Sequence, residues 1–249
     1  MQRLGIDIGG TGIKAAVVDV TTGALLTERE RILTPAGFEL DDIVDTVAHL
    51  VDRFGHDDAV GVGFPGVVAH GVVMSPPTAH EYPGWVGCDL GAAIHDATGL
   101  ATTVLNDADA AGIAEYRFGA GDSQQGMVMV FTLGTGVGSA MIVDGALVPN
   151  TELGKLYLAD RSDVAELQIA DRVRTDEDLK WREWGERLNT YFQHIDRLFT
   201  PDLVIVGGGV SKKHERFLHH IDIRAEVVPA ELRNQAGVVG AAIATVEVS

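Results

Sequence analysis

The chain has a single cysteine, Cys88, among its 249 residues. One cysteine excludes an internal disulfide and a zinc site built from several cysteines. No apolar run reaches the length of about 18 residues that a membrane-spanning helix needs. The N-terminal segment also lacks the basic, apolar and small-residue pattern of a signal peptide. These absences together predict a cytoplasmic protein.

Positive charge is scarce, because 19 lysines and arginines stand against 36 aspartates and glutamates, which gives a net charge of −17. This balance argues against non-specific binding of nucleic acids or acidic membranes, which requires a basic footprint. A few backbone amides and one lysine can still hold a small anion. A long polyanion would need a local, salt-sensitive basic track, for which the candidates are Lys14, Lys212, Lys213 and Arg233.

Two similar segments lie about half the chain length apart: IDIGGTGIKAAVVDVTTGAL at 6–25 and FTLGTGVGSAMIVDGAL at 131–147. Each is typical of an antiparallel strand meander with a glycine turn, and mixed helices and strands follow each one. We therefore predict an α/β fold of two similar lobes, residues 1–120 and 121–249, around a cleft suited to a small molecule. The last helix is a candidate to pack back on the first lobe. Chance recurrence of glycine hairpins is the weaker alternative.

The glycine turns are candidate phosphate-binding loops. Glycine permits positive φ and a close backbone approach to a ligand, and consecutive N–H groups suit phosphate oxygens. Neither turn is a Walker A loop or a dinucleotide fingerprint, because Lys14 is followed by Ala15 and a strand follows each turn. A tight hairpin without a ligand is the alternative. The candidate residues are Gly9, Gly10, Thr11 and Gly12 in the first turn and Gly134, Thr135 and Gly136 in the second.

Carboxylates lie beside two predicted strand ends. Asp7 precedes the first turn, where it could orient water around Mg²⁺ or merely cap the turn. Asn106, Asp107 and Asp109 lie where a buried strand runs directly into a helix. One of the two aspartates is explained as the helix N-cap. The other is expected to project into the ligand crevice and to accept the proton of a hydroxyl that attacks phosphorus.

These pieces resemble a known family. The segments GIDIGGTGIKAAVVD, GFPG, NDADAAG, LGTGVGSA, VPNTELG and VIVGGGVS occur in the order expected of ROK-family sugar kinases, from Leu4 to about Ala244. Within that family the pattern is most similar to the bacterial polyphosphate glucokinases, which lack the zinc motif. The resemblance implies a two-lobed, actin-like (ribonuclease H-like) fold and a homodimer. It further implies Mg²⁺-dependent phosphoryl transfer from inorganic polyphosphate or ATP to the 6-hydroxyl of a hexose, most simply glucose.

The resemblance also implies roles for individual residues. Asp107 would be the general base, and Asn106 would contact the sugar beside it. The rest of the sugar pocket would comprise Gly63, Pro65, Gly66 and Glu152. Asp7 would orient the metal through water. The phosphoryl donor would be held by the two glycine turns with Lys14, and its distal end or nucleoside by Gly207, Gly208 and Gly209.

Two departures from the family pattern affect the sugar pocket. The family reads Glu-Leu-Gly-His where this chain has Lys155, and PPTAHEYPGW at 76–85 replaces a segment whose asparagine touches the sugar. A lysine only donates hydrogen bonds, whereas a neutral histidine can also accept them. Lys155 either forms an ion pair with Glu152 or contacts a phosphoryl acceptor other than glucose. A kinase for another sugar or polyol, or a non-catalytic sugar-binding paralogue, is therefore the alternative function.

Other readings are less favoured. A transcription regulator of the same family would carry a DNA-binding segment before the first turn, and only four residues precede Gly5. A filament-forming or chaperone ATPase gives no reason for the TELG segment. The nine histidines have no metal-binding spacing. Trp181 and Trp184 lie on a long amphipathic helix, where we expect packing or a subunit contact.

Overall fold

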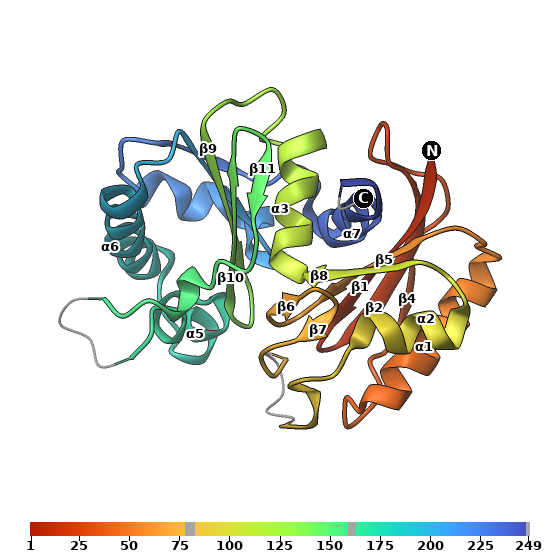
Figure 1. Cartoon of the computed structure of the whole chain (residues 1–249). Coiled ribbons are helices and arrows are strands. Elements are labelled where there is room, and N and C mark those ends of the chain that lie inside the picture. Colours follow the sequence, from red (N-terminus) through yellow and green to blue (C-terminus); the bar gives the residue numbers. More distant parts are fainter. Residues whose placement is uncertain (78–82, 159–162, 248–249) are drawn as a thin grey trace. The chain divides into compact units, whose positions relative to one another are not determined.

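The computed structural model describes residues 1–77, 83–158 and 163–247. The chain forms two compact units, one of residues 1–114 with 235–249 and the other of residues 115–234. The boundary after residue 114 falls inside helix α3 (Asp107–Phe118), which is labelled in Figure 1. Within the described ranges, no helix combines the length and the apolar character needed to cross a bilayer.

The first unit is built on a mixed sheet in the order β3-β2-β1-β5-β8, with β4 also paired to β2. Its first strands form an antiparallel hairpin, whereas β1, β5 and β8 run parallel. A separate two-stranded hairpin, β6 (Val68–Ala69) with β7 (Val72–Val73), follows β5. The strands of the main sheet are β1 (Gln2–Gly9), β2 (Gly12–Asp19), β3 (Ala24–Leu25), β4 (Glu30–Ile32), β5 (Val60–Phe64) and β8 (Thr102–Asn106).

Helices cover both faces of this first sheet: α1 (Leu40–Phe54), α2 (Leu90–Thr98) and α7 (Ala236–Glu247). Because side chains alternate along a strand, Leu4, Ile6 and Ile8 of β1 point to one face, where they share a buried cluster with residues of α1 and α2. Gly5 faces the other side, where the Val238 carbonyl of α7 takes the place of a side chain. Residues from both ends of the chain therefore build this unit (Figure 1).

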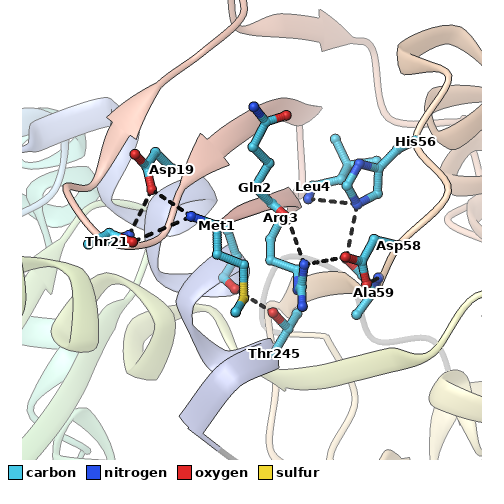
Figure 2. Close-up of polar contacts among 11 residues, drawn as sticks. Met1, Gln2, Arg3, Leu4, Asp19, Thr21, His56, Asp58, Ala59 and Thr245 are labelled. Carbon is cyan, nitrogen blue, oxygen red and sulfur yellow. Dashed lines mark hydrogen bonds and ion pairs between the residues drawn. The ribbon is translucent and has the colours of Figure 1, made fainter.

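Polar contacts hold the start of β1 in place (Figure 2). The Met1 ammonium lies 3.2 Å from Asp19 Oδ1, and Arg3 donates to Asp58 Oδ2 at 2.5 Å. The Thr21 backbone N–H, together with the N-terminal ammonium, holds the pKa of the Asp19 carboxyl below its ordinary value. These contacts anchor the strand whose far end carries Asp7.

The second unit repeats the strand order of the first, as β11-β10-β9-β12-β13. Again the first strands are antiparallel and the last three run parallel. The repeated sequence segments therefore correspond to a repeated topology. The strands are β9 (Met127–Leu133), β10 (Val137–Val143), β11 (Ala146–Val148), β12 (Leu203–Gly207) and β13 (Glu226–Pro229).

Aromatic packing fills the core of the second unit around α6 (Trp181–Phe199). Trp184 is fully buried and donates its indole N–H to the Ile169 carbonyl at 3.0 Å. Trp181 packs edge to face against Trp184 and stacks on Phe217. The packing role expected for the two tryptophans is confirmed. The helical segments beside them are α4 (Glu166–Ile169), α5 (Asp171–Asp176), and the 3-10 helices η3 (Gly209–Arg216) and η4 (Leu218–His220).

Two segments differ from the helices that their sequence predicts. The helix expected from the segment DVAELQIADRVR, residues 163–174, is two short helices, because Ala170 takes an extended conformation, with ψ of 148°, between them. The helix expected at 212–221 is a pair of 3-10 helices, because Lys213 has non-helical dihedrals and Phe217 turns into the core. In both cases the buried side chains of the second core decide the path of the backbone.

Candidate active site

The first glycine turn closes the β1–β2 hairpin. The two strands pair as far as Gly9 and Gly12, which leaves a two-residue loop. The Thr34 hydroxyl donates to the Gly9 carbonyl at 2.5 Å, and Arg31 donates to the Thr11 carbonyl at 2.7 Å. Glycine permits positive φ, but none of the glycines of this turn uses it. The absence of a side chain at Gly12 lets the Arg31 side chain lie against the turn.

A row of charged side chains crosses the sheet next to this turn. Asp7 of β1 is the cross-strand partner of Lys14 on β2, and Lys14 is the partner of Arg31 on β4. The Lys14 ammonium lies 2.7 Å from Asp7 Oδ2. Lys14 thus lies between the Asp7 carboxylate and a second cation, Arg31, and like charges on opposed strands repel unless an anion compensates them. The first turn therefore has the local positive charge that a phosphoryl group requires.

Asp7 has the surroundings of a residue that holds a metal through water. A side chain at position 237 would come within 2.9 Å of the Asp7 carboxyl carbon, so Gly237 at the start of α7 leaves the carboxylate room. Within the described residues, no group of three His, Cys, Asp or Glu side chains could hold a metal ion. Mg²⁺ commonly keeps several waters and binds one or two carboxylates plus substrate phosphates. A single carboxylate beside a phosphate loop fits that chemistry.

The strand-to-helix junction after β8 is capped by Asn106. Its Oδ1 accepts hydrogen bonds from the backbone N–H groups of Ala108, at 2.9 Å, and Asp109, at 3.0 Å. The expectation that one of the aspartates caps α3 is therefore wrong, because Asn106 occupies the N-cap position. Its amide donates to the Gly66 carbonyl at 3.1 Å and so ties the GFPG turn to the helix. Asp107, the first residue of α3, needs no capping role.

Asp107 lies at the same sheet edge as the other candidates of the first unit. Gly63 on β5 is the cross-strand partner of Asp7 on β1. A Cβ at position 63 would lie 3.6 Å from the Asp107 Cα. Asp107 is half-buried, whereas Asp109 is almost wholly buried, so Asp107 is the more accessible of the two aspartates. The first unit thus brings together the first turn, Asp7, the GFPG segment and Asp107.

The second glycine turn, Gly134–Gly136, closes the β9–β10 hairpin as a three-residue loop. The Arg172 backbone N–H at the start of α5 donates to the Gly134 carbonyl at 3.1 Å. The Val137 N–H points at Glu166 Oε2 of α4 at 3.5 Å. None of the glycines of this turn has positive φ either. The helices of the second unit therefore brace the turn through backbone groups and one carboxylate.

The glycine triplet Gly207–Gly209 adjoins this second turn. Gly207 ends β12 and pairs with Thr132 near the end of β9. The Ser211 hydroxyl donates to the Gly208 carbonyl at 2.8 Å, which holds the start of η3. A cavity of about 390 Å³ lies beside η3, within the size range of small-ligand pockets. Its polar lining includes Ser211, His214, Glu231 and Arg233.

Glu152 is held beside β10 by a close approach of its turn. The Leu153 N–H donates to the Ser139 hydroxyl at 3.0 Å. Only glycine fits at position 154, since a Cβ there would lie 2.4 Å from the Val137 carbonyl oxygen. Burial, together with the nearby Glu166 charge, raises the pKa of Glu152, and the positive charge of Lys155 partly offsets that rise.

Lys155 forms an ion pair with Glu166 rather than with Glu152. An ion pair of Lys155 with Glu152 is one of the alternatives that the sequence leaves open. Lys155 does pair with a carboxylate, but the partner is Glu166. Glu166 is nearly buried and also faces the second glycine turn, where a Cβ at Gly136 would meet its Oε2 at 3.0 Å. Lys155 thus links the segment that carries Glu152 to Glu166, which lies beside the second glycine turn.

Sequence reasoning did not find Glu166, Arg31 or Gly237. Strand pairing alone brings Arg31 to the first turn, and packing alone brings Gly237 to Asp7. Glu166 follows Lys155 by 11 positions, across a gap with no recognisable spacing. Of the departure at 76–85, residues 78–82 lie outside the described ranges. Trp85 at its end is buried and donates to the Phe38 carbonyl at 2.8 Å.

The comparison with protein families decides the relationship. The model of the ROK family matches residues 3–163. The chain belongs to the ROK family. It is 42% identical to a polyphosphate glucokinase of Mycobacterium tuberculosis (strain CDC 1551 / Oshkosh), over 97% of this chain and 90% of that protein.

Solved structures of ROK proteins have the same fold. The inorganic polyphosphate/ATP-glucomannokinase from Arthrobacter sp. strain KM superimposes with a TM-score of 0.90 and 44% identity, over 97% of each chain. A ROK family glucokinase from Streptomyces griseus, in complex with glucose and AMPPNP, gives a TM-score of 0.82 at 26% identity, over 97% of this chain and 98% of that one. The two sheets of equal strand order are thus the duplicated halves of the actin-like sugar kinase fold.

Proposed function

We propose that this chain is a glucokinase that transfers a phosphoryl group from inorganic polyphosphate or ATP to the 6-hydroxyl of glucose. One observation carries the proposal: Asp7, Gly63 and the half-buried Asp107 converge at one sheet edge, beside a turn flanked by Lys14 and Arg31. Relatives with the names glucokinase and glucomannokinase at 42–44% identity over 97% of the chain support the same activity.

Asp107 would act as the general base on the sugar. It would accept the proton of the 6-hydroxyl as that oxygen bonds to phosphorus and the bond from phosphorus to the donor oxygen breaks. Its position as the first residue of α3 favours the ionised carboxylate, because a helix N-terminus stabilises negative charge. The backbone of Gly63, Pro65 and Gly66, with Asn106, would line the sugar site.

Each unit has residues that we propose for binding the donor. In the first unit, Gly9–Gly12 and Lys14 would contact its phosphates. In the second, Gly134–Gly136 would contact them as well, and the cavity beside η3 would take the distal end or the nucleoside. When bound, Mg²⁺ would neutralise charge on the donor phosphates, and Asp7 would hold one of its waters.

Glu152 is the proposed hydrogen-bond partner of the sugar ring hydroxyls. Because Lys155 replaces the histidine of the family pattern, a second hexose besides glucose is a candidate phosphoryl acceptor. The Lys155 ammonium is paired with Glu166. Because an ammonium has no acceptor lone pair, it cannot replace a neutral histidine as a hydrogen-bond acceptor. Mannose is the second candidate acceptor, a choice that the name of the Arthrobacter glucomannokinase supports.

A coupled assay of glucose, mannose and other polyols, each with ATP and with polyphosphate, tests the proposal. We expect hexose 6-phosphate as the product, with glucose as the preferred acceptor. Asp107→Asn should lower kcat by about 10²- to 10⁴-fold, the usual contribution of a general base. Glucose binding, measured by calorimetry, should remain. Absence of phosphorylation with every pair would refute the activity, and undiminished turnover of the variant would refute the role of Asp107.

We further propose that the protein is cytoplasmic and that it forms a homodimer. A single cysteine fits a reducing compartment, in which disulfides are rare. The exposed apolar residues of the second unit, such as Tyr157 and Leu198, are available for a subunit contact. Light scattering on the purified chain would give the mass that decides between monomer and dimer.

A further inference from the structure

Three cations of the second unit gather around one indole ring. The Arg174 guanidinium lies 4.2 Å from the centroid of Trp181, the Lys213 ammonium 5.7 Å from it, and the Arg216 guanidinium 5.6 Å from it. We call these four residues the Trp181 cluster. The ring is fixed from below, because Trp181 stacks on the buried Phe217 with an interplanar angle of 15°. The aromatic platform under the three cations is therefore held in place by the core.

The charge of the Trp181 cluster is poorly compensated. Arg174 pairs with Asp171 at 2.9 Å. Lys213 and Arg216 are both exposed, and neither forms an ion pair with any residue that the structure describes. The chain contains 36 acidic but only 19 basic residues, and here two exposed cations lie over the same ring without an acidic partner among the described residues. Like charges held close together repel, and a bound anion would relieve that repulsion.

The Trp181 cluster is connected to both donor loops of its own unit. Arg174 lies two positions after Arg172, whose backbone N–H binds the Gly134 carbonyl of the second glycine turn. Lys213 and Arg216 lie on η3, which follows directly from Gly208. The opposite side of η3, with Ser211 and His214, lines the 390 Å³ cavity. The basic side of η3 is thus distinct from the cavity proposed for the nucleoside.

We propose that the Trp181 cluster binds the part of an inorganic polyphosphate chain that extends beyond the phosphoryl group being transferred. This inference rests on the proposed function, which names polyphosphate as a donor. A guanidinium that lies on an aromatic face keeps N–H groups at its edge for phosphate oxygens. A chain with a net charge of −17 repels a long polyanion, so a local basic surface is required to hold it. ATP, which ends in a nucleoside, gains less from that surface.

The test compares two double variants that each remove two positive charges. Lys213→Gln with Arg216→Gln removes the exposed cations of the cluster. The matched control, Arg53→Gln with Arg197→Gln, removes exposed arginines of α1 and α6 that belong to no proposed site. We would measure kcat and KM for ATP, tripolyphosphate and long-chain polyphosphate at several salt concentrations. Direct binding of long-chain polyphosphate, in the absence of sugar, is the second readout.

We expect the cluster variant to lose roughly ten-fold in specificity for long-chain polyphosphate relative to ATP, with most of the change in KM and with weaker direct binding. Its salt dependence should flatten by about 0.7 in log KM against log salt for each charge removed, as for a single-stranded polyanion. The control should retain the wild-type ratio. If the cluster variant and the control have the same ratio of polyphosphate to ATP specificity, this inference is wrong and the proposed function stands. A wild type that uses ATP but no polyphosphate would overturn the polyphosphate donor as well.

Discussion

The glycine turn of the first unit lies between β1 and β2, and the turn of the second lies at the equivalent place between β9 and β10. The first is flanked by the side chains of Lys14 and Arg31. The second is braced by the Glu166 carboxylate and by the backbone N–H of Arg172. Duplication has thus kept the path of the backbone, while the charge beside it has changed. The first turn adds positive side chains to its own backbone amides.

The equivalent strand ends differ in the same way. In the first unit β5 leads into GFPG and β8 leads into Asn106 and Asp107. In the second unit β12 leads into Gly207–Gly209, and β13 ends at Pro229, before Ala230. In the first unit the carboxylate residue Asp107 directly follows β8, whereas in the second unit Ala230 separates β13 from Glu231. We infer that acid–base chemistry belongs to the first unit and that the second specialises in holding the donor.

The two cores, in contrast, use the same device. Trp85 in the first unit and Trp184 in the second are both buried, and each donates its indole N–H to a backbone carbonyl. Each also packs against two aromatic rings, Phe38 and Phe64 in one case and Trp181 and Phe217 in the other. The shared solution shows that packing demands are alike in the two units, whereas ligand demands are not.

The largest expected effect tests the equality of the cores. Trp85→Ala and Trp184→Ala should each lower the free energy of unfolding by about 3–5 kcal/mol, the usual cost of deleting a buried aromatic side chain. Denaturant unfolding with amide hydrogen exchange assigns each loss to its unit. Trp→Phe at the same positions is the control, because it keeps most of the packing. If only one of the two Trp→Ala variants lost stability, the two buried tryptophans would not contribute equally to their cores.

A medium effect tests the two turns. A Cβ at Gly134 would meet open space, so Gly134→Ala should leave the melting temperature unchanged and raise the donor KM, by about ten-fold if the methyl group costs 1.4 kcal/mol of binding. Gly9→Ala should in addition lower stability, since its Cβ would lie 3.0 Å from the Gly12 carbonyl oxygen. Calorimetry and donor kinetics would be measured on both variants. An unchanged donor KM in Gly134→Ala would remove that turn from the donor site.

The smallest effect concerns pH. Because the pKa of Glu152 is raised in the folded chain, its ionised form costs stability near neutral pH, and that cost declines as the pH falls from the folded-state pKa to the unfolded-state pKa. The nearby charge of Lys155 opposes this rise, so Lys155→Gln should move the acid limb of kcat/KM for glucose to higher pH. In a Glu152→Gln background, Lys155→Gln should no longer move the limb, as measured by pH–rate profiles. A limb that stays in place in Lys155→Gln would show that Lys155 has no electrostatic influence on the sugar site.

Much of this architecture follows from local patterns in the sequence. Alternating apolar residues and glycine turns predict the β1–β2 and β9–β10 hairpins, and the amphipathic spacing of α1 and α6 predicts those helices. The repeat of the first hairpin predicts the duplication. The junction NDADAAG predicts a polar strand end that enters a helix, although the N-cap proves to be Asn106 rather than an aspartate.

The primary sequence by itself determined the two halves, their glycine turns and the placement of Asp107 at a strand end, because each of these depends on neighbours along the chain. Only the tertiary structure decided that Lys155 pairs with Glu166, that Arg31 supports the first turn and that Gly237 gives Asp7 room. It also decided that residues 209–220 form 3-10 helices around Phe217. The physical reason is that such contacts join residues far apart in the chain, whose meeting depends on strand register and core packing and leaves no periodic signal.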